Sequence, residues 1–224
     1  MYRAVIFDLD NTLVDFMAMK RQAIDAAITA MIDAGLDMSP ADVKVHVDRI
    51  YGEQGIEYQQ VFDELLTTVL GKIDYKMLSA GIVAYRRARE AALKPYPHVS
   101  ATLTALVKRG TLLAVVTDAP RREAWLRLCY INFHHIFDTV VTFEDTGKRK
   151  PDSAPFLLAL ERLNVDAGQT LMVGDWVERD MVGAAALGMK TAFARYGDVF
   201  GDQVVRADYI LDDITELLTI IPSK

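Results

Sequence analysis

The chain opens with a short apolar run, Ala4-Val5-Ile6-Phe7, that ends abruptly at two aspartates. A β-prone run without polar alternation is typical of a central strand in a parallel sheet, because such a strand is buried on both faces. Asp8 and Asp10 follow it, and period-two geometry puts them on one side of an extended backbone. Ligands of open α/β sheets bind beyond the carboxyl ends of the strands, so the run predicts a functional edge.

Two carboxylates held this close repel each other, and we expect a partner that offsets their charge. A hard cation fits, because Mg²⁺ prefers oxygen ligands and needs few from the protein. The alternative interpretation of Asp8 and Asp10 is a solvated turn after the strand. The rest of the chain decides between them.

Composition narrows the classes of protein. The chain has 224 residues, enough for one large α/β domain or for a core with a smaller companion, and 51% of them are hydrophobic, as in globular proteins. A net charge of −6 does not indicate a nucleic-acid-binding surface. The single cysteine, Cys129, excludes an intramolecular disulfide framework and fits a reducing compartment.

We expect neither a secretion signal nor a membrane-spanning segment. The first strand follows the amino terminus at once, without the basic region and apolar core of a signal peptide, and no apolar run reaches membrane-spanning length. We therefore expect a cytoplasmic protein with no membrane partner and no nucleic-acid partner. The sequence leaves the oligomeric state open.

Residues 16–93 differ from the rest of the chain in the spacing of their apolar residues. Apolar residues recur there at helical spacing in four successive segments, with Ser39 and Pro40 as a helix start and Gly71 as a stop. The stiff exit Lys94-Pro95-Tyr96-Pro97 follows. The pattern predicts an all-helical insert over residues 16–93 and a second unit made of residues 1–15 and 94–224.

After the exit, strands and helices alternate. We expect strands at residues 112–116, 139–142 and 170–173, with two shorter ones at 190–193 and 209–210. Helices are expected at residues 99–108, 120–128, 154–163 and 177–187, and a polar loop at 144–152. This alternation predicts an α/β fold, a doubly wound, Rossmann-like parallel sheet with an inserted helical domain.

Polar residues of particular kinds follow four of these strands. In a parallel sheet all four ends lie on one edge, which would carry Asp8 and Asp10, Thr117, the loop with Lys150, and Asp175 with Asp180. Such an edge meets the needs of phosphoryl transfer, namely a nucleophile, a hydroxyl donor, a cation for the phosphate and a metal that neutralises charge.

Each residue also has an ordinary structural interpretation when taken alone. Thr117 could be a strand-end hydroxyl, and Lys150 a member of a solvated basic run. Asp175 could be a helix N-cap, and Asp180 a surface residue of that helix.

The order of these motifs resembles that of haloacid dehalogenase (HAD) superfamily hydrolases, in the phosphatase branch with a helical, C1-type cap after the first strand. The resemblance covers essentially the whole chain and rests on Asp8-Leu9-Asp10-Asn11-Thr12, Thr117, Lys150-Pro151, and Gly174-Asp175 with Asp180. It implies a HAD catalytic core at residues 1–15 and 94–224 and a cap at residues 16–93. Specificity for the leaving group is then expected in the cap.

The resemblance implies roles for the site residues. Asp8 attacks phosphorus and forms an aspartyl-phosphate, and Asp10 protonates the leaving oxygen before it deprotonates the attacking water. Lys150 pairs with Asp8 and the phosphate, while Thr117 and the backbone N–H of Asp118 hold other phosphate oxygens.

The implied cofactor is Mg²⁺. Its expected ligands are Asp8, the backbone carbonyl of Asp10, and Asp175, with Asp180 in support. Asp10 favours phosphate chemistry over dehalogenation, so we expect a phosphatase for a small phosphorylated metabolite. A phosphomutase of the same superfamily is the first alternative, and a non-catalytic metal- or phosphate-binding relative the second.

The sequence departs from the family pattern at two positions. Trp176 follows Asp175 where a small polar residue is more usual, and it either forms one wall of the substrate pocket or packs against a neighbouring loop. Asp118 stands where asparagine is more frequent. The stretch Glu178-Arg179-Asp180 resembles small archaeal-type phosphatases, some of which act on glyceraldehyde 3-phosphate.

Overall fold

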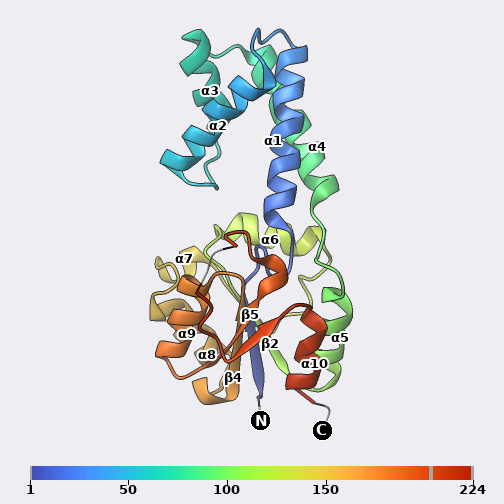
Figure 1. The fold of residues 1–224 in the computed structure, drawn as a ribbon, viewed down its shortest axis with the longest axis vertical. Coiled ribbons are helices and arrows are strands. Elements are labelled where there is room, and N and C mark those ends of the chain that lie inside the picture. The colour runs from blue at the N-terminus through green and yellow to red at the C-terminus, as the bar shows by residue number, and fades with distance from the viewer. Residues whose placement is uncertain (1, 202–203, 223–224) are drawn as a thin grey trace. The chain divides into compact units, whose positions relative to one another are not determined.

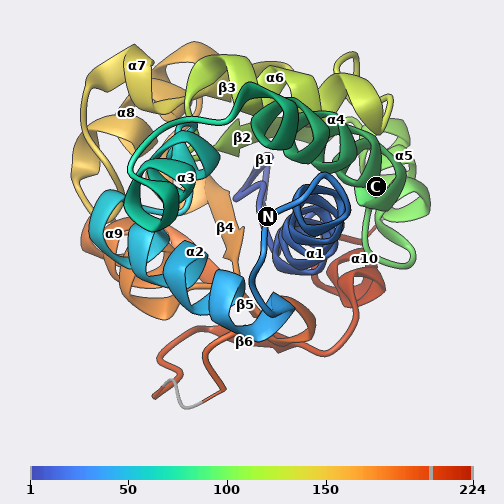
Figure 2. The same cartoon turned by 90° about the horizontal axis from the view of Figure 1, so that it is seen from above.

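A six-stranded parallel sheet forms the centre of the larger part of the molecule. The computed structural model describes residues 2–201 and 204–222. The sheet order is β3-β2-β1-β4-β5-β6 (Figures 1 and 2). Its strands are β1 (Ala4–Phe7), β2 (Leu112–Val116), β3 (Thr139–Val141), β4 (Thr170–Gly174), β5 (Lys190–Ala194) and β6 (Tyr209–Leu211). The predicted α/β fold is confirmed.

Helices cover both faces of this sheet. In Figure 1, α8 (Ser153–Leu163) and α9 (Val182–Ala186) lie on one side, and α5 (Val99–Lys108) and α10 (Leu217–Ile220) on the other. The α8 side holds an apolar core in which Ile6 and Met172 of the sheet meet Phe156 of α8. Burial on both faces explains why the central strands read as continuous apolar runs.

The register of the central strands sets the position of their carboxyl ends. Phe7 lies opposite Val115 on one side and Val173 on the other, so β1, β2 and β4 end at nearly the same level. The Asp8 N–H then donates to the Val173 carbonyl at 2.9 Å. The segments after these three strands therefore start from one edge of the sheet.

Two segments differ from the sequence-based expectation. The predicted helix at residues 177–187 begins with a π-helical turn, η2 (Val177–Met181), and only then continues as α9. The predicted polar loop contains a short helix, α7 (Phe143–Thr146), whose start is fixed by a capping box between Thr142 and Asp145. Both features depend on hydrogen bonds rather than on apolar periodicity, so the periodicity did not predict them.

The chain divides into two compact units, one made of Met1–Met17 and Lys94–Lys224 and the other of Ala18–Leu93. Apart from the first two residues of α1, the second unit contains α1 (Phe16–Asp33), α2 (Pro40–Gln54), α3 (Val61–Leu70) and α4 (Tyr75–Ala92). Ser39 and Asp74 cap α2 and α4 through their side chains. All four helices contribute to one apolar core, for which Met31, Val47, Leu65 and Leu78 are examples.

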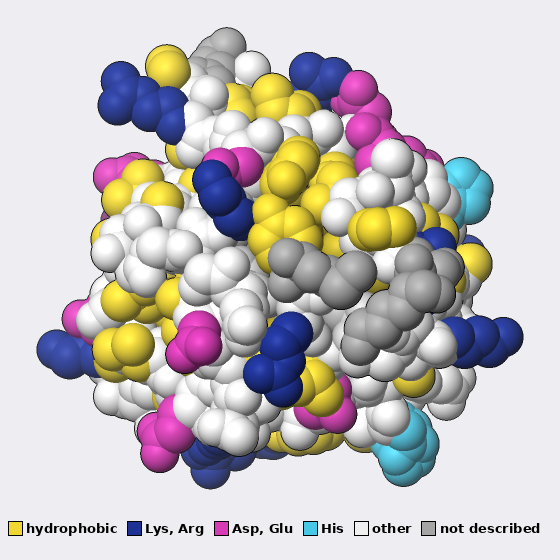
Figure 3. Space-filling model, turned by 90° about the horizontal axis from the view of Figure 1, so that it is seen from below, with side chains coloured by type: hydrophobic (Ala, Val, Ile, Leu, Met, Phe, Trp, Pro, Cys, Tyr) yellow, Lys and Arg dark blue, Asp and Glu magenta, His cyan; other side chains and the backbone are white. Residues whose placement is uncertain are grey.

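The remaining elements connect or end the first unit. They are α6 (Arg121–Tyr130) and the 3-10 turns η1 (Ala167–Gln169), η3 (Arg195–Gly197) and η4 (Ile214–Glu216). Within the described residues, no helix combines the length and the apolar character needed to cross a bilayer. At the amino ends of the strands, acidic and basic side chains are interspersed on the surface (Figure 3).

Candidate active site

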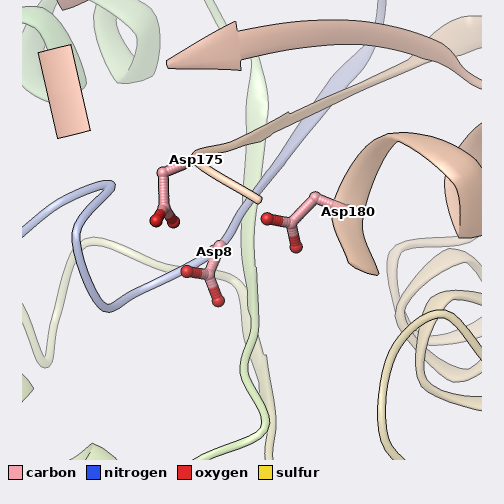
Figure 4. Close-up of side chains that lie close together, drawn as sticks. All are labelled: Asp8, Asp175 and Asp180. Atoms are coloured by element: carbon pink, nitrogen blue, oxygen red, sulfur yellow. The ribbon is translucent and has the colours of Figure 1, made fainter. Parts of the chain in front are cut away.

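Three buried carboxylates meet at the carboxyl edge of the sheet. Asp8 follows β1, Asp175 follows β4, and Asp180 lies on η2. One oxygen from each lies within 4.8 Å of the others, and Figure 4 shows the three side chains around a common space. The structure thus brings together three of the predicted site residues from separate parts of the sequence.

Two glycines and one hydroxyl make this arrangement possible. A Cβ on Gly174 would lie 2.3 Å from the Asp180 carboxylate, so glycine allows Asp180 to fold back over the end of β4. A Cβ on Gly197 would lie 1.6 Å from the carbonyl oxygen of Asn11, so η3 can pass close to the turn after β1 only with glycine there. The Thr12 hydroxyl donates to Asp175 Oδ1 at 3.1 Å and orients that carboxylate.

Lys150 supplies a positive charge inside this group. Its Nζ lies 2.6 Å from Asp8 Oδ1 and 2.6 Å from Asp180 Oδ1, and the side chain is buried. Burial alone lowers the pKa of a lysine, but the charges of Asp180 and Asp8 outweigh it and raise the pKa of Lys150. Lys150 is therefore an ammonium ion at neutral pH.

One ammonium does not balance three carboxylates. The pKa of Asp180 is raised to about 6, and the pKa of Asp175 is raised well above its usual value. Burial is the largest cause of both shifts. The charge of Asp8 adds to both effects. A buried set of carboxylate oxygens with excess negative charge fits a hard divalent cation such as Mg²⁺. Asp8, Asp175 and Asp180 are the side chains that would hold it.

The carboxylate of Asp10 lies in a different contact. Its Oδ2 accepts a hydrogen bond from Arg127 Nη1 at 2.9 Å, and the buried Arg127 side chain comes from α6. The guanidinium carbon lies 4.5 Å from the centre of the Phe16 ring. Sequence reasoning missed Arg127, because nothing local marks one arginine in a helix as the partner of a residue 117 positions earlier.

Thr117 and Asp118 follow β2 at the same edge. Thr117 is buried, and its hydroxyl oxygen accepts from the Ala119 N–H at 3.1 Å, which leaves the hydroxyl proton available for donation. Asp118 Oδ1 accepts from the backbone N–H of Lys150 at 2.9 Å. The loop after β2 is thereby connected to the loop that carries Lys150.

Trp176 lies between two side chains. The guanidinium carbon of Arg179 is 3.7 Å from the centre of its ring, and the Phe200 ring is centred 4.5 Å away. Arg179 also pairs with Asp118, at 3.2 Å between Nη1 and Oδ2. Sequence reasoning noted the stretch around Arg179 but gave this residue no role. A wall of the substrate pocket at Trp176 stays a prediction.

The chain is similar to known proteins over nearly its whole length. A glyceraldehyde 3-phosphate phosphatase of Methanocaldococcus jannaschii is 35% identical, over 99% of this chain and 97% of the relative. An enzyme of the same name from Methanopyrus kandleri is 34% identical, with the same two coverages. The crystal structure of a HAD phosphatase from Thermococcus onnurineus matches with a TM-score of 0.72 and 25% identity, over 100% of this chain and 99% of that one.

The family assignment covers most of the sequence. Residues 5–194 match the profile of the family described as haloacid dehalogenase-like hydrolase, and this range includes every predicted site residue. The sequence-based resemblance is confirmed, and the chain belongs to the haloacid dehalogenase-like hydrolase family.

Proposed function

We propose that this protein is a Mg²⁺-dependent phosphatase that hydrolyses a small phosphate monoester through an aspartyl-phosphate on Asp8. The observation that carries the proposal is the placement of the Asp8 carboxylate, 2.6 Å from the Lys150 ammonium and beside Asp175 and Asp180. In the proposed reaction, these side chains supply the nucleophile, a fixed cation and the metal ligands.

The names of the relatives support the substrate class. Five similar curated proteins are named glyceraldehyde 3-phosphate phosphatases, and the first matches this chain over nearly its whole length. Glyceraldehyde 3-phosphate is therefore the first substrate to test, within a wider set of small phosphorylated metabolites.

In the first half of the reaction, an oxygen of the Asp8 carboxylate forms a bond to phosphorus while the bond from phosphorus to the leaving oxygen breaks. Asp10, which enters this half as the carboxylic acid, gives its proton to that leaving oxygen, which departs as an alcohol. Lys150 and the hydroxyl of Thr117 hold phosphoryl oxygens, together with the backbone N–H of Asp118. A bound Mg²⁺ supplies charge that offsets the repulsion between the Asp8 carboxylate and the phosphate dianion.

The second half consumes water. Asp10, now a carboxylate, takes a proton from a water molecule whose oxygen bonds to phosphorus, and the bond between phosphorus and Asp8 breaks. Inorganic phosphate leaves, and Asp8 and Asp10 return to their starting states. Because the same residue gives and then takes the proton, one position serves both steps.

We assign choice of the leaving group to the helical segment at residues 16–93, as a cap of the catalytic core at residues 1–15 and 94–224. The core residues named above act on the phosphoryl group, which all substrates share. Discrimination must therefore depend on other residues, and the helical unit with its own apolar core is a separate body that can supply them.

The test is phosphate release from a panel of small phosphate monoesters with Mg²⁺, glyceraldehyde 3-phosphate among them. We expect turnover with Mg²⁺, loss of turnover in chelator and its return on adding the metal. Conversion of a substrate to an isomer without phosphate release would indicate a mutase instead. Unchanged phosphate release in chelator would contradict the proposed role of the carboxylates.

A further inference from the structure

Asp118 places an additional carboxylate next to the site. Its Oδ1 accepts from the Lys150 N–H at 2.9 Å, and its backbone carbonyl accepts from Arg149 Nη1 at 3.2 Å. Both bonds hold the segment that carries Lys150 against the end of β2. An asparagine side chain could accept the same bond through its amide oxygen, so the bond to Lys150 does not require a charge.

The charge of Asp118 creates a problem for the proposed reaction. It lies near enough to act on the Lys150 ammonium. A phosphate dianion held by Thr117 and Lys150 would face this carboxylate in addition to the three buried carboxylates of the site. A like charge at short range opposes anion binding, so the site needs something that offsets Asp118.

Arg179 is placed to do so. Its Nη1 lies 3.2 Å from Asp118 Oδ2, and the Asp118 side chain is only 12% exposed, so solvent screens this pair incompletely. The guanidinium also stacks on the Trp176 ring at 3.7 Å. The backbone N–H of Trp176 donates to Asp180 Oδ2 at 3.1 Å, which fixes the start of the turn that carries Arg179.

The π-helical turn η2 gives Arg179 and Asp180 separate tasks. Asp180 is 1% exposed and lies with Asp8 and Asp175, while the Arg179 side chain is 37% exposed and contacts Asp118. Turns of this kind are rare and are often found at functional sites. Of these two neighbouring residues, Asp180 therefore belongs to the buried carboxylate group and Arg179 pairs with Asp118.

We propose that Arg179 is a positioning residue that offsets the charge of Asp118, so that this carboxylate orders the Lys150 segment without repelling the phosphoryl group. The inference rests on the proposed function. It also predicts that the need for Arg179 depends on the presence of a carboxylate at residue 118. A residue that contacted the substrate directly would be needed whatever stood at residue 118.

A double-mutant cycle tests this dependence. The variants are Arg179→Gln, Asp118→Asn and the double substitution, and the measured quantities are kcat/KM for an aryl phosphate and the affinity for inorganic phosphate with Mg²⁺ by calorimetry. We expect Arg179→Gln to lower both by about tenfold in the wild-type background. In the Asp118→Asn background, the same substitution should change each by less than about twofold.

Two further variants serve as controls. Arg179→Lys keeps the positive charge and should retain more of both quantities than Arg179→Gln. Arg162→Gln removes a comparably exposed arginine that pairs with Asp145 at 3.0 Å, and it should alter phosphate affinity by less than about twofold. Thermal denaturation of every variant separates loss of folding from loss of binding.

An equal loss from Arg179→Gln in both backgrounds would overturn the inference, and so would no loss in the wild-type background. Phosphate affinity needs no turnover, so the proposed function and this inference can fail separately. A wild-type protein that binds phosphate and shows the coupling, yet hydrolyses no monoester, would end the proposed function alone. Absence of phosphate binding in the wild-type protein would overturn both.

Discussion

The carboxylates of the site fall into two regions that are balanced in different ways. In the inner region, the ammonium of Lys150 pairs with Asp8 and Asp180, and Asp175 lies beside them. In the outer region, Asp10 pairs with Arg127 and Asp118 pairs with Arg179, one guanidinium for each carboxylate. Each of these guanidiniums also lies over an aromatic ring, that of Phe16 or of Trp176.

The difference shows at which carboxylates the protein leaves negative charge for a ligand to neutralise. The inner region keeps an excess of negative charge, which a divalent cation would offset. Burial first, and then the charge of Asp8, raise the pKa values of Asp175 and Asp180. In the outer region, the chain itself supplies a guanidinium for each carboxylate when that carboxylate is ionised. Charge that the chain has already offset adds little to the repulsion of a phosphate, so the outer carboxylates can position groups at small electrostatic cost.

Loss of the inner nucleophile should have the largest effect. Asp8→Asn is nearly isosteric but replaces a carboxylate by a poor nucleophile, and we expect kcat to fall by at least about 10⁴-fold. Phosphate release and circular dichroism measure activity and folding. Asp212→Asn, at an exposed ion pair with Arg195, is the matched control and should keep its activity. An Asp8→Asn preparation with undiminished turnover would end the covalent mechanism.

Loss of an inner metal ligand should come next. Saturating Mg²⁺ should raise the Tm of the wild-type protein, because a ligand that binds only the folded state at 100 times its Kd adds about 2.7 kcal/mol of stability. Asp175→Asn should remove most of this shift, and Asp180→Asn less of it, since we expect Asp175 to bind the metal directly. Calorimetric titration with Mg²⁺ gives the affinities. Equal shifts in all three proteins would place the metal elsewhere.

The outer pair at Asp10 should matter in a way that depends on the leaving group. Arg127→Met removes the contact that holds the Asp10 carboxylate, and general acid catalysis contributes about 10²–10⁴-fold. We expect kcat/KM to fall by about 30-fold for an alkyl phosphate, whose leaving oxygen needs a proton. For an aryl phosphate with an acidic leaving group, the loss should stay below about threefold.

Arg127→Lys keeps the charge and should restore part of the activity toward alkyl phosphates. A structural defect without connection to proton transfer would lower activity toward both substrates equally. Equal losses would therefore show that Arg127 does not act through Asp10.

The two regions also differ in how far the sequence predicts them. Asp8, Thr117 and Asp175 directly follow apolar strands, and strand ends of a parallel sheet share an edge, so strand recognition was enough to bring them together. Arg127 and Arg179 lie on a helix and on a π-helical turn, where no spacing marks them. Their partners are set by how α6 and η2 pack in three dimensions, which periodicity does not contain.

The same limit applies to the backbone of the site. Apolar spacing predicted one continuous helix at residues 177–187, but Asp180 folds back to the backbone N–H of Trp176, and η2 precedes α9. Gly174 leaves the space for this fold-back, and its role becomes visible only when the distance to Asp180 is known. A local bond from the backbone to a side chain and the close contact at Gly174 therefore accompany this departure from a continuous helix.

The smallest expected effect concerns Trp176, and it separates the two interpretations of this residue. If the ring serves the outer region by supporting Arg179, Trp176→Ala should lower kcat/KM by about two- to fivefold for every substrate, since an exposed cation–π contact is worth about 0.5–1 kcal/mol. Trp176→Phe, which keeps a ring, should cost less than about twofold. If the ring is a wall of the substrate pocket, both variants should instead change the order of preference among small phosphate monoesters. Relative kcat/KM values over such a panel decide the matter, because a uniform loss indicates support of Arg179 and a reordered panel indicates contact with the leaving group.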